Sequence, residues 1–182
     1  MTTHERADGA APVTVTVHPT AMGLLTLAAT EEALVYCGFT GPAAVRDRLA
    51  RSGAAGPVRS EPSPAATPVL RTAAAELDAY LAGRLRHFSV PLDLRLATPF
   101  CRETVGALDA FVPYGHLATY SELAASLGRP KAARAVGTAL GANPLCVVLP
   151  CHRIVGSTGR LTGYAGGIRA KEFLLGLERQ VP

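Results

Sequence analysis

The chain has 182 residues, of which 48% are hydrophobic and 18% are charged, and its formal net charge is +4. This length and composition provide one fair-sized core or two small domains, and they exclude disorder of the whole chain. No run approaches the roughly 18 apolar residues of a membrane span, and the polar residues 1–6 do not resemble a signal peptide. We therefore expect a folded protein with no membrane partner.

The positive charge is concentrated in the C-terminal half. Residues 1–97 contain nine Arg and nine Asp or Glu, whereas residues 98–182 contain nine Lys or Arg and five Asp or Glu. This excess suggests a polyanion such as a nucleic acid as the partner, and a solvated basic face would give the same pattern. Charge alone does not decide between the two.

The chain contains four cysteines with neither a Cys-x-x-Cys pair nor the spacing of a disulfide framework: Cys37, Cys101, Cys146 and Cys151. Thiols of this kind fit a reducing compartment, so we expect a cytoplasmic protein of bacterial type that meets the nucleoid when it acts. His18, Cys37 and His87 lack the spacing of zinc ligands, and we expect no metal and no other cofactor.

The N-terminal half predicts a small antiparallel sheet. Residues 1–12 show no periodicity and are expected to form a flexible tail. Apolar and polar residues then alternate or cluster between turn-prone breaks, which predicts strands at 13–17, 24–27 and 33–39.

Three further segments complete this half. Residues 53–68 are rich in Gly, Pro, Ser and Ala, which predicts a loop. Apolar side chains at helical spacing predict a helix over 68–82, and the alternation over 90–96 predicts a strand that returns to the sheet. The sequence therefore predicts an α/β domain over residues 1–97.

Residues 98–182 predict a second, mostly helical domain. Thr98 before Pro99 is a helix start, with proline at the first helical position. Apolar residues continue at helical spacing as far as Phe111. We expect one helix over this stretch.

Two shorter helices follow after a turn. Thr119 and Glu122 have the Thr-x-x-Glu spacing of a capping box, which begins a helix that ends at Gly128. Pro130 is expected to begin the next helix, which closes near Gly141. Two helices joined by a glycine-containing turn predict a helix-turn-helix of winged-helix-like type, a geometry that docks on DNA.

The second of these helices is made almost entirely of small residues, and Lys131 and Arg134 carry its charge. Small residues such as Ala132 and Ala133 often just let helices pack closely. They also make a helix slim enough for a narrow groove, where Arg134 could reach phosphates or fill the gap left by an extruded base.

The stretch Pro150-Cys151-His152-Arg153 places a cysteine beside an imidazole and a guanidinium. Nearby positive charge favours thiolate over thiol, which makes Cys151 the candidate nucleophile. An isolated Cys-His pair is more often structural, because free cysteines are commonly buried as small hydrophobes. The neighbouring segments therefore decide the interpretation.

Two segments follow the cysteine. Residues 156–167 contain five glycines, which make either a connector or a loop whose backbone can approach a planar ligand. A closing helix over 170–178 ends in Glu178, which could orient an imidazole as the third member of a nucleophile–base–orienter set.

Taken together, residues 98–178 resemble the O6-alkylguanine-DNA alkyltransferases, also called methylated-DNA–protein-cysteine methyltransferases. Several motifs in the family's order are more specific than Pro-Cys-His-Arg alone. They are Tyr114-Gly115, Thr119-Tyr120-Ser121-Glu122-Leu123-Ala124, Arg129-Pro130-Lys131-Ala132-Ala133-Arg134-Ala135-Val136-Gly137, Asn143-Pro144, Pro150-Cys151-His152-Arg153, Gly163-Tyr164-Ala165-Gly166-Gly167 and Lys171-Glu172-Phe173-Leu174-Leu175.

The resemblance implies DNA repair by direct, irreversible transfer of the alkyl group from O6-alkylguanine, and also from O4-alkylthymine, in double-stranded DNA. Cys151 would accept the alkyl group and be consumed in one turnover. His152 would take the thiol proton through a water, Glu178 would orient His152, and Asn143 would brace the active-site turn. The family further implies a monomer.

The resemblance also assigns the DNA contacts. The slim helix with Lys131, Ala132 and Ala133 would lie in the minor groove, and Arg134 would replace the flipped-out nucleotide. Tyr120 would assist rotation of the nucleotide and protonate the leaving guanine. The implied substrate pocket consists of Tyr164, Ala165, Val155 and Pro150.

Three features depart from the family pattern. Thr104-Val105 stand where many relatives carry a bulky aromatic, Cys101 stands where a polar residue is common, and the zinc ligands of some relatives are not recognisable. Three other functions compete with alkyl transfer. They are lesion recognition without chemistry, whose related proteins replace the acceptor cysteine, a helix-turn-helix regulator, and a Cys-His hydrolase, which would need an oxyanion hole.

Overall fold

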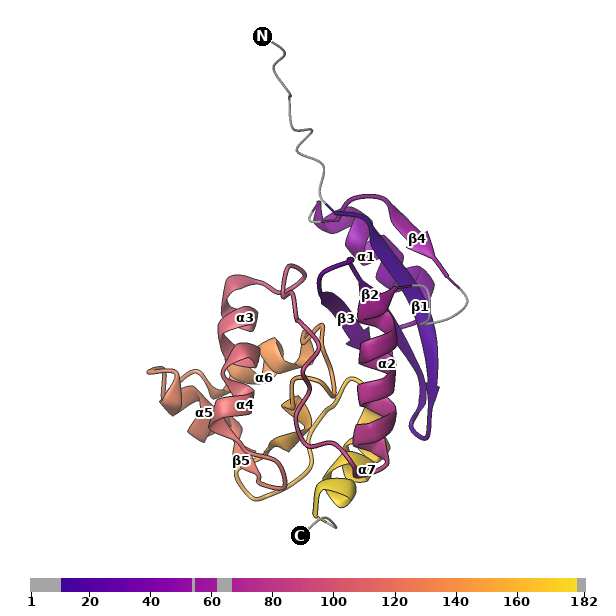
Figure 1. Cartoon of the computed structure of the whole chain (residues 1–182). Coiled ribbons are helices and arrows are strands. Elements are labelled where there is room, and N and C mark those ends of the chain that lie inside the picture. The colour runs from indigo at the N-terminus through magenta and orange to yellow at the C-terminus, as the bar shows by residue number, and fades with distance from the viewer. Residues whose placement is uncertain (1–10, 54, 62–66, 180–182) are drawn as a thin grey trace.

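The computed structural model describes residues 11–53, 55–61 and 67–179, and it shows an N-terminal sheet with helices packed beside a helical C-terminal half (Figure 1). Most of the predicted tail, residues 1–10, and part of the predicted loop, residue 54 and residues 62–66, lie outside the described ranges. Among the described helices, none is long and apolar enough to cross a membrane.

The sheet has four strands in the order β3-β2-β1-β4: β1 (Val13–Thr20), β2 (Gly23–Ala29), β3 (Leu34–Gly38) and β4 (Val58–Ser60). The first three strands pair antiparallel, as the alternation predicts. The sheet is mixed rather than wholly antiparallel, because a fourth strand that was not predicted, β4, pairs parallel to β1. The predicted loop at 53–68 therefore contains a short strand that covers the edge of β1.

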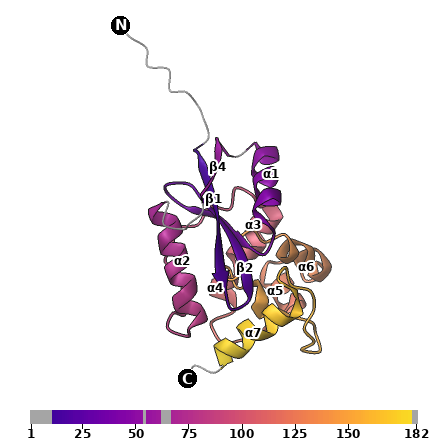
Figure 2. The same ribbon diagram turned by 90° about the vertical axis from the view of Figure 1, so that its right-hand side faces the viewer.

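Two helices flank the sheet (Figure 2). Helix α1 (Pro42–Ser52) was not predicted, because it buries only Val45 and Leu49 among charged and small residues. These two side chains pack in a cluster of their own with residues of the three antiparallel strands. Helix α2 (Pro68–Leu81) was predicted, and the Thr67 side chain caps it by accepting from the backbone N–H of Leu70.

The segment predicted as a strand at 90–96 does not form one. Leu92 makes an isolated parallel bridge to Leu34 at the edge of β3, and only two backbone hydrogen bonds support it. The segment then turns, because the Asp93 carboxylate accepts from the backbone N–H of Arg95 at 2.8 Å. This capture of a backbone donor by a side chain ends the pairing.

The C-terminal half contains one turn of 3-10 helix, Cys151–Arg153, and five α-helices among its described residues: α3 (Pro99–Gly106), α4 (Leu108–Phe111), α5 (Tyr120–Ser126), α6 (Ala133–Gly141) and α7 (Gly167–Arg179). Short strands β5 (Ala118–Thr119) and β6 (Ile154–Val155) pair in parallel. The single helix expected from Thr98 is broken at Ala107. The predicted capping box of α5 is present in full.

The helix expected to begin at Pro130 begins three residues later. Pro130 and Lys131 lie in a turn, and the backbone N–H of Ala132 donates to Arg129 at 2.8 Å. Ala132 is the N-cap residue of α6 and supplies no side-chain cap. The turn between α5 and α6 is therefore longer than the sequence suggested.

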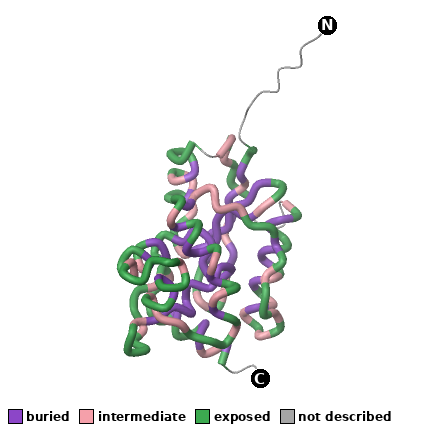
Figure 3. Tube along the Cα trace, turned by 90° about the vertical axis from the view of Figure 1, so that its left-hand side faces the viewer, coloured by how far each residue is buried: buried purple, intermediate pink, exposed green. Residues whose placement is uncertain are grey.

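One hydrophobic core joins the two halves. It contains Leu25, Leu27 and Cys37 from the sheet, the inner face of α2, and buried residues of α3, α5, α6 and α7. Figure 3 shows buried segments of the chain meeting at the centre of the molecule. The position of the C-terminal helices is therefore fixed by the sheet.

Candidate active site

The turn that carries Cys151 is attached to the edge of the N-terminal sheet. The backbone N–H of Cys37, in β3, donates to Pro144, and the N–H of Cys146 donates back to Cys37, both at 2.8 Å. Within the turn, Val147 has φ 71°, a left-handed conformation that a β-branched residue rarely adopts. Such a conformation costs roughly 1–3 kcal/mol and persists only where neighbouring contacts impose it.

Asn143 holds this turn in shape from inside. Its side-chain oxygen accepts from the backbone N–H of Leu145 at 2.9 Å. Its amide donates to the carbonyl of Leu149 and to Sγ of Cys151, both at 3.2 Å. Asn143 therefore contacts the candidate nucleophile directly as well as the backbone around it.

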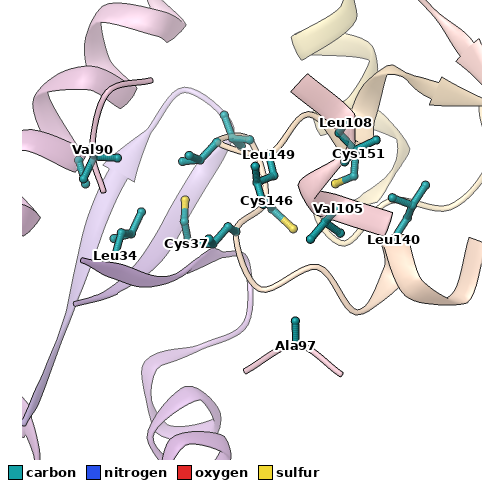
Figure 4. Close-up of a cluster of buried hydrophobic side chains, with 14 of the residues drawn as sticks. Leu34, Cys37, Val90, Ala97, Val105, Leu108, Leu140, Cys146, Leu149 and Cys151 are labelled. Carbon is teal, nitrogen blue, oxygen red and sulfur yellow. The ribbon is translucent and has the colours of Figure 1, made fainter. Parts of the chain in front are cut away.

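The surroundings of Cys151 favour the thiolate. The pKa of Cys151 lies below its ordinary value because of a hydrogen bond from Cys146, with the Asn143 amide and the charge of Lys171 acting in the same direction against the effect of burial. The hydrogen bond to Cys151, together with burial, raises the pKa of Cys146, which remains a thiol. Figure 4 shows Cys37, Cys146 and Cys151 within one buried cluster.

The cation near the sulfur is Lys171 rather than the adjacent Arg153. Lys171 is fully buried, and its ammonium donates to the carbonyls of Ile154 at 2.6 Å and Thr162 at 3.3 Å. Burial lowers the pKa of Lys171. The expectation that the flanking guanidinium favours the thiolate is not supported, because Arg153 is committed elsewhere.

Arg153 forms a buried ion pair with Glu178. Its Nε donates to the two carboxylate oxygens at 3.1 and 2.9 Å, and its Nη1 donates to the carbonyl of Val112 at 2.9 Å. The backbone N–H of Gly115 also donates to Glu178. Despite the effect of burial, hydrogen bonds from His152, Arg153 and Tyr80 lower the pKa of Glu178 to about 2.

His152 directly follows Cys151 in the sequence, and its side chain is fully buried. Its Nε2 is 2.9 Å from Oε1 of Glu178. Burial lowers the pKa of His152 below its ordinary value and outweighs the opposing effect of Glu178. His152 is therefore neutral at neutral pH, and its Nδ1 has no hydrogen-bond partner among the described residues.

A cavity of about 740 Å³ opens above the cysteine. It is lined by Cys151 and by residues of α5, of α6 and of the segment between β6 and α7: Tyr120, Ala133, Arg134, Gly137, Thr138, Leu140, Gly141, Thr162, Gly163, Tyr164 and Ala165. This volume lies in the range of small-molecule pockets and is ample for a purine base. The hydroxyl of Tyr120 accepts from Thr162 at 2.9 Å across the cavity.

The structure thus brings most of the candidate residues together. Tyr120, Arg134, Tyr164, Ala165 and Ala133 line the cavity, and Cys151 lies at its buried end. The remaining candidates are arranged around it: His152, Glu178 and Asn143 lie beneath the cavity, Lys131 and Ala132 precede α6, and Pro150 and Val155 are buried outside the lining.

Three residues that contact the site had no assigned role from sequence. The Tyr80 hydroxyl donates a hydrogen bond to Glu178, a hydrogen bond from Cys146 lowers the pKa of Cys151, and Lys171 supplies the positive charge near Cys151. A signal existed only for Lys171, which shares the inner face of α7 with Glu178 at a spacing of seven residues. Within the described ranges, no group of three or more His, Cys, Asp or Glu residues could hold a metal ion.

Comparison with known families places the chain. Residues 99–180 match the model described as 6-O-methylguanine DNA methyltransferase, DNA binding domain. Residues 13–94 match the model described as 6-O-methylguanine DNA methyltransferase, ribonuclease-like domain. The chain therefore belongs to the 6-O-methylguanine DNA methyltransferase family.

Individual relatives agree with this assignment. A methylated-DNA–protein-cysteine methyltransferase of Mycolicibacterium paratuberculosis is 50% identical over 105 residues, which cover 58% of this chain and 62% of that protein. One of Methanosarcina barkeri is 50% identical over 111 residues, or 59% of this chain and 67% of that protein. The aligned stretch thus spans about two thirds of these relatives.

Solved structures extend the similarity to nearly the whole chain. The O6-methylguanine methyltransferase of Mycobacterium tuberculosis superposes with a TM-score of 0.77 at 36% identity, covering 93% of this chain and 94% of that one. The same mycobacterial protein in complex with DNA matches equally well and is covered to 95%. The enzyme of Pyrococcus kodakaraensis superposes with a TM-score of 0.62 at 27% identity.

Proposed function

We propose that this chain repairs DNA by transferring the alkyl group of O6-alkylguanine, and also of O4-alkylthymine, to Sγ of Cys151. One observation carries the proposal: a cysteine with a lowered pKa lies at the buried end of a base-sized cavity that a slim basic helix borders. Family membership gives the substrate class, since the relatives named above are methylated-DNA–protein-cysteine methyltransferases.

The proton of Cys151 leaves through His152. With its Nε2 on the Glu178 carboxylate, the neutral imidazole carries its proton on Nε2 and keeps a lone pair on Nδ1. We assign Nδ1 as the base that accepts the thiol proton through a bridging water. Glu178 orients the ring and stabilises the imidazolium that forms.

The transfer itself is a single displacement. The thiolate attacks the alkyl carbon, a carbon–sulfur bond forms, and the bond from that carbon to O6 breaks with its electron pair leaving on the guanine. Tyr120 supplies the proton that restores neutral guanine. The product thioether has no group beside it that reverses the bond, so each chain acts once.

The target base reaches the cavity by extrusion from the duplex. In this proposal α5 and α6 form the helix-turn-helix, and α6 lies in the minor groove with Ala132 and Ala133 against the DNA and Lys131 near a phosphate. Arg134, at the cavity wall, takes the place of the flipped nucleotide. Tyr164 and Ala165 contact the extruded base.

The protein is proposed to act as a monomer, without a metal or other cofactor, on duplex DNA in the cytoplasm. These assignments follow from the family resemblance and from the reduced state in which Cys151 must be kept.

Intact mass measurement tests the proposal. After mixing with duplex DNA that contains O6-methylguanine, each chain should gain one methyl group, and peptide mapping should place it on Cys151. Cys151→Ser should gain none, while Cys101→Ser, which replaces a buried cysteine bonded to Ala139, should gain one. Binding without a mass change would overturn the proposal.

A further inference from the structure

Tyr80, in the N-terminal half, contacts the buried pair of His152 and Glu178, which we call the relay. Tyr80, on α2, is 1% exposed, and its hydroxyl donates to Oε1 of Glu178 at 2.5 Å. The same oxygen of Tyr80 lies 3.2 Å from Nε2 of His152. Tyr80, Glu178 and His152 therefore form a closed triangle of polar contacts.

We propose that Tyr80 is a positioning residue for the reaction, which holds the His152 imidazole with its proton on Nε2 and its lone pair on Nδ1. The inference rests on the proposed function for its consequence, since it concerns the group that accepts the proton of Cys151. It adds a member from the N-terminal half to a set of groups that otherwise come from the C-terminal half.

The direction of the hydrogen bond follows from the state of the phenol. Burial, followed by the charge of Glu178, raises the pKa of Tyr80 far above its ordinary value, so the phenol stays protonated. A protonated phenol beside a carboxylate donates to it, which leaves the lone pairs of the phenol oxygen facing Nε2. Both the carboxylate and the phenol oxygen can therefore accept from Nε2–H, and neither can donate to it.

The position of the phenol is fixed by packing. The ring of Tyr80 meets Tyr114 edge to face at 6.0 Å between centroids and lies against Phe88 at 5.1 Å. Its backbone lies in a helix whose inner face belongs to the common core. The hydroxyl is thus held relative to the sheet, and the imidazole is held relative to the hydroxyl.

Tyr80 also moderates the charge of Glu178. Its hydrogen bond is one cause of the lowered pKa of that carboxylate. A carboxylate whose charge is shared among several donors binds a neighbouring imidazolium less strongly, which keeps His152 neutral and able to accept a proton. The other charged or titratable groups that face His152 are Arg153 beside it, Lys171 from α7, and the Tyr164 ring at 6.4 Å.

Tyr80→Phe in the full chain tests the inference, because it removes the hydroxyl and keeps the ring. We expect the pKa of His152 to rise, so transfer slows about threefold to tenfold at about pH 6 and less than twofold at about pH 8. Tyr36→Phe is the matched control, since it removes another buried phenol of the N-terminal half, one that hydrogen-bonds to Thr40 rather than to Glu178 or His152. Its pH profile should equal that of the unmodified chain.

A second measurement does not depend on transfer. Nitrogen-15 NMR of the unmodified chain near pH 8 should show neutral His152 protonated on Nε2, and Tyr80→Phe should raise the midpoint of its titration. A neutral tautomer protonated on Nδ1 would overturn the inference even if the variant did not fold. An unchanged rate, or an equal loss at every pH, would also overturn it. Failure of the unmodified chain to accept a methyl group would instead overturn the proposed function.

Discussion

The two halves of the molecule contribute to the candidate site in different ways. Every residue that lines the cavity lies between Tyr120 and Ala165, in the C-terminal half. The N-terminal half lines none of it, yet it contacts the site through the backbone of Cys37, the ring of Phe39 and the hydroxyl of Tyr80. Reactive groups and the supports that hold them thus belong to different parts of the chain.

This division shows what an apparently inactive half can do. A thiolate and an imidazole react only when they are held within a few tenths of an ångström of a productive geometry. Here the strained turn before Cys151 is hydrogen-bonded to the edge of the sheet at Cys37, and the Glu178 carboxylate is hydrogen-bonded to Tyr80 on α2. Substitutions can distinguish the residues that hold the site in place from the residues that take part in alkyl transfer.

Glu178→Gln should cause the largest loss of both stability and transfer rate, because Glu178 bonds to groups of both halves. The change removes the buried counter-charge of Arg153 and leaves only the exposed Asp109 carboxylate at 3.8 Å, and we expect a fall of about 3 kcal/mol in the free energy of unfolding. Transfer should slow about 100-fold, since the imidazole loses its orienting carboxylate. Chemical denaturation and single-turnover kinetics measure the two effects. Glu172→Gln, on the exposed face of the same helix, should change neither.

The same carboxylate predicts how stability depends on pH. The pKa of Glu178 is about 2 in the folded chain against an ordinary 4.5, so its folded-state contribution is fully present above about pH 4.5. It is lost as pH falls toward 2 and amounts to about 3 kcal/mol. Denaturation between these pH values should show this slope in the unmodified chain. A slope of equal size in Glu178→Gln would contradict the assignment.

Lys171→Met should change the reactivity of Cys151 more than it changes how the turn around Cys151 is held. It removes the cation that favours the Cys151 thiolate and two hydrogen bonds to backbone carbonyls. We expect the pKa of Cys151 to rise toward its ordinary value. The pH dependence of alkylation by iodoacetamide measures this shift. Arg169→Met, exposed at the start of the same helix, should leave the midpoint in place.

Arg134→Ala should affect DNA handling alone. If this side chain replaces the extruded nucleotide, repair of duplex DNA should slow about tenfold, because extrusion costs a few kcal/mol. Reaction with free O6-benzylguanine should stay within twofold, since a free base needs no extrusion. Equal losses on both substrates would remove the assignment. Arg71→Ala, which deletes an exposed charge from α2, controls for the general loss of positive charge.

Gly166→Ala should give the smallest effect and tests the Phe39 contact. A Cβ at this position would lie 2.4 Å from the Phe39 ring, which also packs edge to face on Tyr164 at 5.8 Å. We expect the ring and the cavity wall to shift and transfer to slow severalfold. Gly176→Ala, where a Cβ meets no heavy atom within 4 Å, should leave the rate unchanged.

Much of the fold could be predicted because it depends on local pattern. The three antiparallel strands, α2 and the capped α5 all carry their signals within a few residues. No such local signal marks β4, since three residues in a Gly- and Pro-rich stretch become a strand only by pairing with β1. The alternation at 90–96 misled for the opposite reason, because Asp93 ends the pairing after one bridge.

The site divides in the same way. Cys151, His152 and Asn143 lie within ten residues, and Glu178 lies in the last turn of the next helix, so the motifs that carry the family resemblance were enough to group them. Tyr80 is 98 residues from Glu178 in sequence, and only the packing of α2 against α7 brings them together. The source of positive charge near Cys151 was equally hidden, since the adjacent Arg153 points to Glu178.

We propose that Cys151 is an acceptor consumed in a single turnover and held in place by both halves of the chain. Titration with excess duplex DNA containing O6-methylguanine tests it most directly, by counting guanines restored per chain. The account predicts a plateau at one, with the methyl group on Cys151 and no further repair on longer incubation. Continued turnover beyond one guanine per chain, or a plateau with Cys151 unmodified, would contradict it.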